Sequence, residues 1–176
     1  MNKIIKYLAL AVYYSTLRFL PRSNFPIFGK ASKKLRYLCC LIIFKKCGKN
    51  VNVERLAFFG SGFNLEIGDN SGLGRNCVVQ SDIKIGKNVL IGPNFYILSR
   101  NHAYENASIT IKEQKYHPKL KTIIEDDVWI GRDVLFTPGR HIKKGIVIAA
   151  RAVVTKNFEE YAVIGGNPSK LIKKRL

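Results

Sequence analysis

Aliphatic residues return at every sixth position through most of the chain, and at many of these positions a glycine follows at once. One run contains Ile67, Leu73, Val79, Ile85, Ile91 and Ile97. A second run, in strict step, contains Ile124, Ile130, Phe136, Ile142, Ile148 and Val154, and an earlier degenerate run passes through Cys47, Val53, Phe59 and Leu65. A period of six fits neither a helix nor a long alternating strand, and it is typical of a parallel β-helix built from hexapeptides.

Each hexapeptide is expected to form one short strand and one corner, so that three of them complete a triangular coil. The aliphatic residue points inward, and the glycine relieves crowding where the backbone turns. The repeats provide for roughly four or five coils, stacked at about 4.8 Å, with open ends that need caps. Coincidental spacing in a β-sandwich is the alternative, and two phased runs of six units speak against it. The sequence therefore predicts an all-β solenoid.

The hexapeptide phase begins near residue 48, and the chain before it is apolar and basic. We expect a helix over 4–20, a turn-rich connector over 21–29 and a second helix over 32–46 that covers the first coil with its apolar face. Only eleven uncharged residues separate Lys6 from Arg18, fewer than the ~20 that cross a bilayer. No convincing signal-peptide cleavage site follows. Contact with a membrane surface and packing between subunits both remain open for the first helix.

The chain is accordingly divided into three parts. Residues 1–47 form a helical cap or membrane-surface segment, residues 48–166 form the β-helix with a protruding loop at 101–122, and residues 167–176 form a basic tail with a short C-terminal helix. Thirty Lys and Arg against twelve Asp and Glu give a net charge of +18, which favours phosphate-bearing cofactors, lipid diphosphates or anionic membranes. The chain carries no recognisable nucleic-acid motif. Four cysteines without CxxC spacing predict reduced thiols in a cytoplasmic protein.

The period is interrupted once, between Ile97 and Ile124, which lie 27 positions apart where the repeat allows 6. A loop of about twenty residues must therefore leave a corner of the prism, and long loops on rigid scaffolds usually carry function. The loop is polar and includes Asn101, His102, Tyr104 and Glu105. A histidine has a pKa suited to removing the proton of a hydroxyl near neutral pH.

Five segments together resemble a known family. They are residues 85–94 (IGKNVLIGPN), 100–102 (RNH), 124–131 (IEDDVWIG), 152–156 (AVVTK) and 165–170 (GGNPSK). The chain resembles the hexapeptide-repeat acyltransferases over most of residues 48–176. The likeness is strongest to the maltose and galactoside O-acetyltransferases and to related enzymes that modify capsule, O-antigen and colanic acid sugars. This resemblance implies a left-handed β-helix, acetyl-CoA as co-substrate and a homotrimer whose active sites are shared between adjacent prisms.

The resemblance assigns the catalytic base to His102, which would let a sugar hydroxyl attack the thioester directly, without an acyl-enzyme. A backbone N–H of Gly131 or Arg132 is the expected oxyanion donor. Glu105 is the nearest acidic residue that could orient the imidazole. The hexapeptide count places His141 one coil above residue 102, where it would tune the base or fill a corner. The residues expected to contact the acceptor are Asp82, Asn101 and Tyr104.

The coenzyme side is carried over from the last coils and the tail. Trp129 is expected beside the pantetheine arm, or alternatively at a subunit contact. Ala149 and Ala150 would leave a groove for the same arm. The remaining expected contacts are Thr155 and Lys156, in a segment that touches the coenzyme, and Lys170 and Lys173, which would hold its phosphates.

One departure leaves the acceptor open: the stretch Leu73-Gly74-Arg75-Asn76 has no amide at the place that matches the one with which the galactoside and maltose enzymes hold the acceptor sugar. The basic, apolar N-terminal region suits an acceptor near a membrane, such as a glycan on a lipid diphosphate. We therefore predict an O-acetyltransferase of surface-polysaccharide biosynthesis, in the cytoplasm or peripheral at the inner face of the membrane.

Three other functions are compatible with part of the sequence pattern. An antibiotic or small-sugar O-acetyltransferase would share the architecture, and a polyanion-binding scaffold would explain the charge alone. A carbonic-anhydrase-like enzyme of the same fold needs three converging histidines. Because His102, His117 and His141 lack that spacing, no metal is expected.

Overall fold

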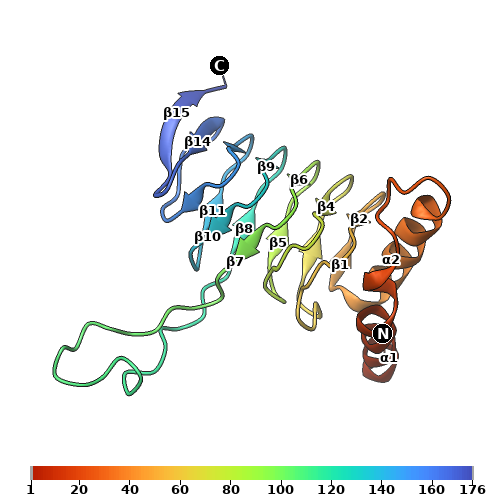
Figure 1. Ribbon diagram of the computed structural model, residues 1–176, viewed down its shortest axis with the longest axis horizontal. Helices are drawn as coiled ribbons and strands as arrows, with labels where there is room; N and C mark the ends of the chain where they lie inside the picture. Colours follow the sequence, from red (N-terminus) through yellow and green to blue (C-terminus); the bar gives the residue numbers. More distant parts are fainter. Residues whose placement is uncertain (1, 176) are drawn as a thin grey trace.

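Two helices and a triangular stack of short parallel strands make up the chain (Figure 1). The computed structural model describes residues 2–175. Helix α1 (Lys3–Ser15), the 3-10 helix η1 (Leu17–Phe19) and helix α2 (Gly29–Ile43) form a cap at one end. The prism that follows is a left-handed parallel β-helix, as the hexapeptide period and the family resemblance together predicted.

Fourteen strands form the three faces of the prism. They are β1 (Lys46–Cys47), β2 (Asn52–Val53), β3 (Glu66–Ile67), β4 (Gly72–Leu73), β5 (Lys84–Ile85), β6 (Leu90–Ile91), β7 (Tyr96–Ile97), β8 (Ile123–Ile124), β9 (Trp129–Ile130), β10 (Leu135–Phe136), β11 (His141–Ile142), β12 (Val147–Ile148), β13 (Val153–Val154) and β14 (Ala162–Gly165). The first face contains β1, β3, β5, β8 and β11. The second contains β2, β4, β6, β9, β12 and β14. The third contains β7, β10 and β13, and parallel bridges from Phe58 to Val78 and from Val78 to Tyr96 extend it toward the cap.

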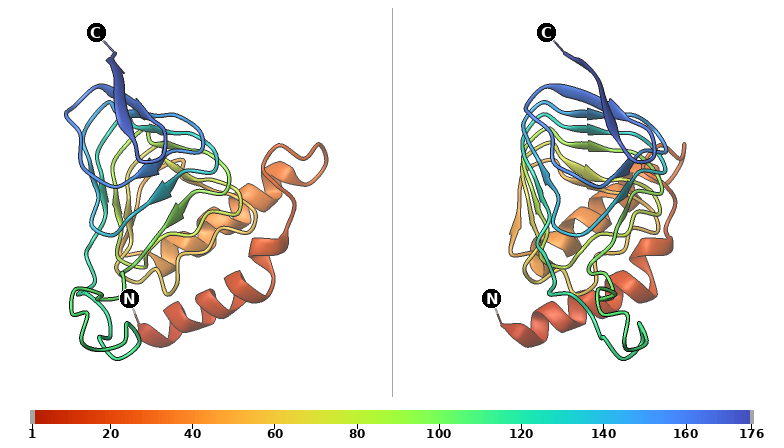
Figure 2. Two further views of the ribbon diagram at one scale, coloured as in Figure 1. Left: turned by 60° about the vertical axis from the view of Figure 1, so that its left-hand side comes forward. Right: turned by 90° about the vertical axis from the view of Figure 1, so that its left-hand side faces the viewer.

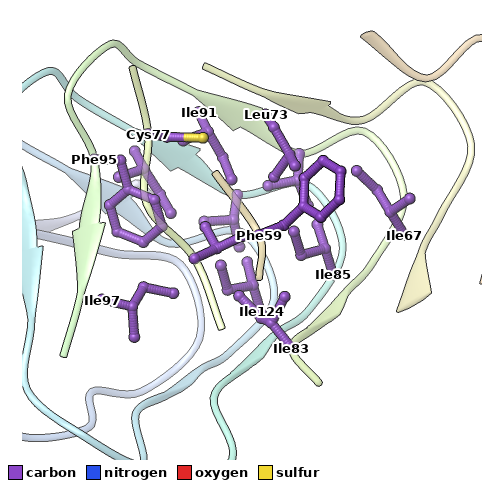
Figure 3. Packing of buried hydrophobic residues seen from close by; sticks show 14 of the residues in the cluster. Phe59, Ile67, Leu73, Cys77, Ile83, Ile85, Ile91, Phe95, Ile97 and Ile124 are labelled. Carbon is purple, nitrogen blue, oxygen red and sulfur yellow. The ribbon is translucent and has the colours of Figure 1, made fainter. Parts of the chain in front are cut away.

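The inward residues stack in register and fill the prism. Ile67 pairs with Ile85, and Ile85 pairs with Ile124 across the interrupted segment. These side chains are at most 2% exposed, and Figure 3 shows them packed with Phe59 and Leu73 around the axis. The five or six strands on each full face exceed the roughly four or five coils expected, because the degenerate first repeats also form rungs.

The corners explain the glycines that follow the aliphatic residues. A Cβ on Gly74 would lie 2.2 Å from the carbonyl oxygen of Gly92, so the backbones of successive coils touch there. Another corner is occupied by Asn50, Asn70 and Asn88, whose φ angles of 55° to 56° lie in the left-handed region that asparagine tolerates. Their side-chain amides form a ladder, with N–O distances of 3.2 and 3.3 Å.

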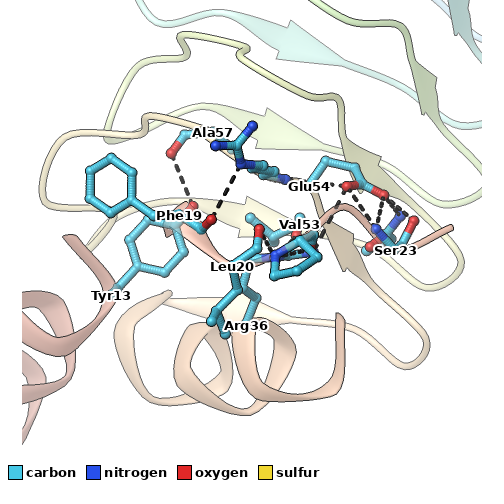
Figure 4. Close-up of polar contacts among 11 residues, drawn as sticks. Tyr13, Phe19, Leu20, Ser23, Arg36, Val53, Glu54 and Ala57 are labelled. Carbon is cyan, nitrogen blue, oxygen red and sulfur yellow. Dashed lines mark hydrogen bonds and ion pairs between the residues drawn. The ribbon is translucent and has the colours of Figure 1, made fainter. Parts of the chain in front are cut away.

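The cap covers the first coil, as expected, although its helices are offset from the predicted ranges. Helix α1 ends at Ser15 rather than near residue 20, and α2 runs three residues earlier than 32–46. The Tyr13 hydroxyl donates to the Ala57 carbonyl oxygen at 2.9 Å. The fully buried Arg36 donates from Nε to the Val53 carbonyl oxygen at 2.6 Å and from Nη1 to the carbonyls of Leu20 and Pro21 (Figure 4).

The prediction of a short C-terminal helix is wrong. Residues Lys170–Lys174 form strand β15, which pairs antiparallel with β14 and closes the end of the prism opposite the cap (Figure 2). The last coil presents unpaired N–H and C=O groups at its edge, and a strand satisfies them where a helix would not.

Residues after β7 leave the corner between the third and first faces as a long loop, and the chain returns to the prism at β8 (Figure 1). The interruption of the period therefore marked the position of the loop correctly. Across residues 2–175, no helix has the length and apolar character that a membrane span requires.

Candidate active site

His102 lies at the root of the protruding loop, with its side chain exposed to solvent. The two ends of the loop meet there, because His102 forms an antiparallel bridge with Tyr116 and the Asn101 carbonyl oxygen accepts the His117 N–H at 2.9 Å. The rings of His102 and Tyr116 are 4.0 Å apart with an interplanar angle of 35°. The Arg100 guanidinium lies over the same tyrosine, 5.1 Å from its centroid. The loop base thus holds an accessible imidazole against an aromatic ring.

Glu105 does not contact His102 in this structure. Its carboxylate lies 2.9 Å from His117 Nε2 and accepts the Tyr104 N–H at 3.0 Å. The backbone N–H groups of Glu105 and Tyr104, with a smaller effect of His117, lower the pKa of the Glu105 carboxyl. The Glu105 side chain therefore points toward His117, and the orienting contact expected between Glu105 and His102 is not formed.

His141 does not lie over residue 102. It pairs with Ile123 on the first face, because the chain has already left the prism at residue 102 and returns only at β8. His141 Nε2 is 2.7 Å from Glu125 Oε1. The two side chains line a pocket of about 420 Å³ on the first face. Asp82 lies at the other root of the loop, where its carboxylate accepts a hydrogen bond from Lys119 Nζ at 3.0 Å.

Trp129 lies on the second face and is 53% exposed. Its neighbours in register are Leu90 on the rung toward the cap and Val147 on the rung away from it. The loop root occupies the corner between the third and first faces, opposite the second face. A single chain therefore does not bring His102 and Trp129 together.

The two candidate oxyanion donors differ in availability. The Gly131 N–H donates to the Ile148 carbonyl oxygen at 2.8 Å and is part of the ladder between coils. Within residues 2–175, the Arg132 N–H has no hydrogen-bond partner. The Arg132 guanidinium pairs with Asp133 at 3.1 Å.

Small residues meet at the corner beyond Trp129. A Cβ on Gly131 would lie 2.6 Å from the Ala150 backbone nitrogen, and the Ala149 Cβ is 3.0 Å from the position that a Cβ on Gly165 would take. The structure therefore places Gly131, Ala149 and Ala150 in one column beside Trp129. Successive coils are in close backbone contact at this column, and its side chains project little from the surface.

The C-terminal end of the prism contains a pocket of about 390 Å³. Lys156 and Lys170 line it together with Lys174, Phe158 and Leu171. The Lys156 Nζ lies 5.5 Å from the centroid of the Phe158 ring. Phe158 was not predicted for this site, since it lies outside the hexapeptide period and reaches the pocket through its bridge to Ile142.

The other predicted coenzyme residues lie nearby without lining this pocket. Lys173 pairs with Val163 across β14 and β15 and is exposed. The Thr155 carbonyl oxygen accepts a hydrogen bond from Arg140 at 2.5 Å. No group of three His, Cys, Asp or Glu side chains in the described part of the chain is placed to hold a metal ion.

Comparison with known proteins agrees with this architecture. The model for bacterial transferase hexapeptide repeats matches residues 64–98. The galactoside O-acetyltransferase of Escherichia coli K12 is 32% identical over 134 residues, which cover 75% of this chain and 64% of that protein. A chloramphenicol acetyltransferase of Agrobacterium fabrum is 42% identical over 81 residues, covering 46% of this chain and 36% of that protein. The chain spans less than two thirds of the length of these curated relatives.

Two solved structures are similar over nearly the whole chain. A maltose O-acetyltransferase from Clostridium difficile 630 has a TM-score of 0.75 and 26% identity, covering 98% of this chain and 89% of that one. A galactoside acetyltransferase in complex with coenzyme A has a TM-score of 0.74 and 25% identity, covering 99% and 84%. The fold and these similarities define a left-handed β-helix protein of the hexapeptide-repeat class. Residues 64–98 carry bacterial transferase hexapeptide repeats, and the chain is similar to maltose and galactoside O-acetyltransferases.

Proposed function

We propose that the protein is an acetyl-CoA-dependent O-acetyltransferase that acts on a sugar hydroxyl. The observation that carries the proposal is the exposed His102 at the closed base of a loop, on a prism similar to acetyltransferases along almost its full length. The coenzyme A complex of a structural neighbour supports the same donor.

In the proposed reaction, His102 removes the proton of the acceptor hydroxyl as its oxygen attacks the thioester carbon of acetyl-CoA. The free N–H of Arg132 stabilises the oxyanion of the tetrahedral intermediate. The C–S bond then breaks, and protonated His102 returns its proton to the coenzyme thiolate. The products are an acetyl ester and free coenzyme A, and no acyl-enzyme forms.

The proposed coenzyme path runs along the second face. Trp129 packs against the pantetheine arm beside the Gly131 and Ala150 column, and Ala149 and Thr155 extend this surface toward the C-terminal end. The cationic pocket with Lys156 and Lys170, together with the nearby Lys173, binds the phosphates. Asp82, Asn101 and Tyr104 at the loop roots are proposed to contact the acceptor.

A homotrimer would complete the site. His102 projects from a corner opposite the face that carries Trp129, so a three-fold arrangement can set the corner of one prism against the second face of the next. Because each prism has both halves of the site, three equivalent interfaces give three active sites.

The cap supports an acceptor near an anionic membrane, as expected for surface-polysaccharide biosynthesis at the cytoplasmic side. Ile4, Leu8 and Val12 lie along one face of α1 and are 51–66% exposed. No acidic residue precedes Glu54. Antibiotic O-acetylation is the second candidate, favoured by the chloramphenicol acetyltransferase relative. A screen of glycans, small sugars and chloramphenicol as acceptors separates the two.

Calorimetric titration with acetyl-CoA at fixed ionic strength tests the donor. We expect micromolar binding by the wild type and by His102→Ala, and weaker binding by Lys170→Glu and Lys173→Glu. Lys34→Glu is the control, because it makes the same charge change on the cap, far from the C-terminal pocket. Absence of binding by the folded wild-type protein would overturn the proposal and favour a polyanion-binding scaffold.

A further inference from the structure

A pocket of about 510 Å³ lies at the cap end of the second face, on the same side of the prism as Trp129. Its floor is formed by β2, β4 and β6, and its wall by residues 22–24 and by Lys33 of α2. Leu90 lines this pocket and pairs in register with Trp129 on the next rung. The pocket therefore opens beside the surface to which we assign the reactive end of acetyl-CoA.

A buried polar network fixes the wall of the pocket. Glu54 accepts hydrogen bonds from the Ser23 hydroxyl and from the Ser23 N–H, the latter at 3.2 and 3.3 Å. Arg36, beneath it, binds the carbonyls of Leu20 and Pro21 (Figure 4). The chain on both sides of Arg22 is thus tied to the prism, which holds Arg22 at the rim of the pocket.

The charge of the pocket is positive. Glu54 is its single acidic lining residue among those described, and its oxygens are already occupied by Ser23, by the Asn52 amide at 3.1 Å and by the Arg55 N–H at 3.2 Å. Arg22, Lys33 and Arg75 also line the pocket, and within residues 2–175 none of the three has an ion-pair partner. Three cations therefore face a cavity in which the Glu54 carboxylate is already hydrogen-bonded to other groups.

The remaining walls suit a saccharide. Leu90, Ile91 and Pro93 provide an apolar side against which a sugar ring can lie, and Asn70 and Asn88 place amides at the opposite corner. The pocket also contains Asn52, whose buried Oδ1 has no hydrogen-bond partner in the described residues. Such a combination of apolar surface, amides and unpaired cations matches a sugar that carries an oxyanion.

We propose that this pocket binds the acceptor through an oxyanion, either a phosphate or a sugar carboxylate, held by Arg22, Lys33 and Arg75. The guanidinium groups offer the forked donors that such groups accept in pairs. The identification of the bound anion as part of the acceptor rests on the proposed function, whereas the binding of an anion in this pocket does not.

Direct binding without acetyl-CoA tests the proposal, using glucose 1-phosphate, glucuronate and glucose as probes at fixed ionic strength. We expect at least one anionic probe to bind about tenfold or more tightly than glucose, as hydrogen bonds to a charged group allow. Arg22→Gln and Arg75→Gln should each remove most of that difference. Tighter binding of the phosphate indicates a phosphorylated acceptor, and tighter binding of glucuronate indicates an acidic sugar.

Two control variants locate the site. Lys34→Gln removes a charge next to Lys33 without lining the pocket, and Lys121→Gln removes an exposed charge just before β8, so both should leave the difference intact. Equal binding of all three probes, no binding of any, or an equal loss in the control variants would each overturn the proposal. Acetyl-CoA titration of Arg75→Gln separates the two hypotheses, because the donor site should be unaffected when only the anion pocket is disrupted.

Discussion

His102 owes its position to the closure of the loop rather than to the coil beneath it. The bridge to Tyr116 and the hydrogen bond between Asn101 and His117 join the loop ends, so the imidazole sits on a short ribbon instead of a free strand. Tyr116 packs against one side of the ring. The residue is exposed to solvent, as a base that meets an acceptor hydroxyl requires.

Replacing His102 by alanine should reduce kcat by a factor of about 10²–10⁴, the usual contribution of a general base. The Kd for acetyl-CoA and the melting temperature should stay near wild type, because the side chain is exposed. Steady-state kinetics beside calorimetry measures both. His117→Ala is the matched control: it removes a neighbouring histidine bound to Glu105 and should retain turnover. Wild-type rates in His102→Ala would refute its role as base.

The residues that sequence reasoning placed correctly are those governed by the period. Ile85 and Ile124 stack because the repeat resumes in phase after the loop. His141 was misplaced because the same count was carried through residues that leave the prism. Glu105 was assigned by proximity along an irregular loop, where side-chain direction follows local hydrogen bonds. Arg22 gave no signal, since a buried network brings it to the second face.

At the scale of the elements, the cap is attached to the prism by polar contacts as well as by packing. Arg36 is fully buried in α2, and its guanidinium links the connector after η1 to β2. Burial raises the pKa of Glu54, but hydrogen bonds from Ser23 and Asn52 outweigh it, so the pKa of Glu54 lies below its ordinary value. Removing Glu54 leaves Arg36 without its carboxylate, 3.8 Å away.

Glu54→Ala should lower the free energy of unfolding by about 3 kcal/mol near neutral pH, as expected when a buried ion pair loses one partner. Because the folded pKa of Glu54 is lowered, its contribution is present above the unfolded value and is lost as pH falls through the folded value. Urea unfolding at a series of pH values should therefore show the variant and wild type converging in acid below about pH 4. Glu160→Gln, on the surface, should show no such difference, and a constant gap down to low pH would contradict the assignment.

The fold of the strands was predictable from the sequence, while the ends of the molecule were not. Each hexapeptide adopts the same strand-and-corner conformation, so the six-residue period predicts every strand of the prism. The tail Lys170–Lys174 has no repeat, and its conformation is decided by the edge of β14 that it satisfies. The helix limits shifted for the same reason, because contacts with the first coil decide where α1 and α2 end.

At the scale of the whole molecule, the two halves of the proposed site lie on opposite sides of the prism. If the proposed trimer forms, co-expressing His102→Ala with Trp129→Ala should restore activity, because mixed assembly can join an intact histidine to an intact tryptophan. In an equal, random mixture, an interface is active only when one subunit carries the intact histidine and its neighbour carries the intact tryptophan. This occurs at about one quarter of the interfaces, so about one quarter of the wild-type rate is expected. Each variant alone is the control, and a mixture no more active than its components would argue against a shared site.

Charge is also divided along the molecule. Eleven of the 30 Lys and Arg precede Glu54, which is the first of the 12 acidic residues. The exposed apolar residues of α1 lie within this basic segment. Two such caps repel each other, so an anionic bilayer fits the surface better than a second copy of the chain does.

The protein should co-sediment with phosphatidylglycerol vesicles and not with phosphatidylcholine vesicles, and rising salt should release it. Leu8→Gln and Val12→Gln should weaken vesicle binding, because they remove the apolar contact while leaving the charge. Leu171→Gln, an equally exposed leucine at the other end of the prism, serves as the control. Binding that ignores lipid charge or the α1 variants would exclude this surface as the contact.

The regular stacking of strands also fixes the distance between the cap and the loop along the axis of the prism. The loop returns at the fourth strand of the first face, three steps from β1, which places it about 14 Å along the axis from the first rung at the usual strand spacing. With the cap resting on a bilayer, the reactive corner would stand at a height fixed by whole coils. Adding or deleting one coil below the loop would move that corner by a single step of about 4.8 Å, and the reach of a membrane-held acceptor would have to change with it.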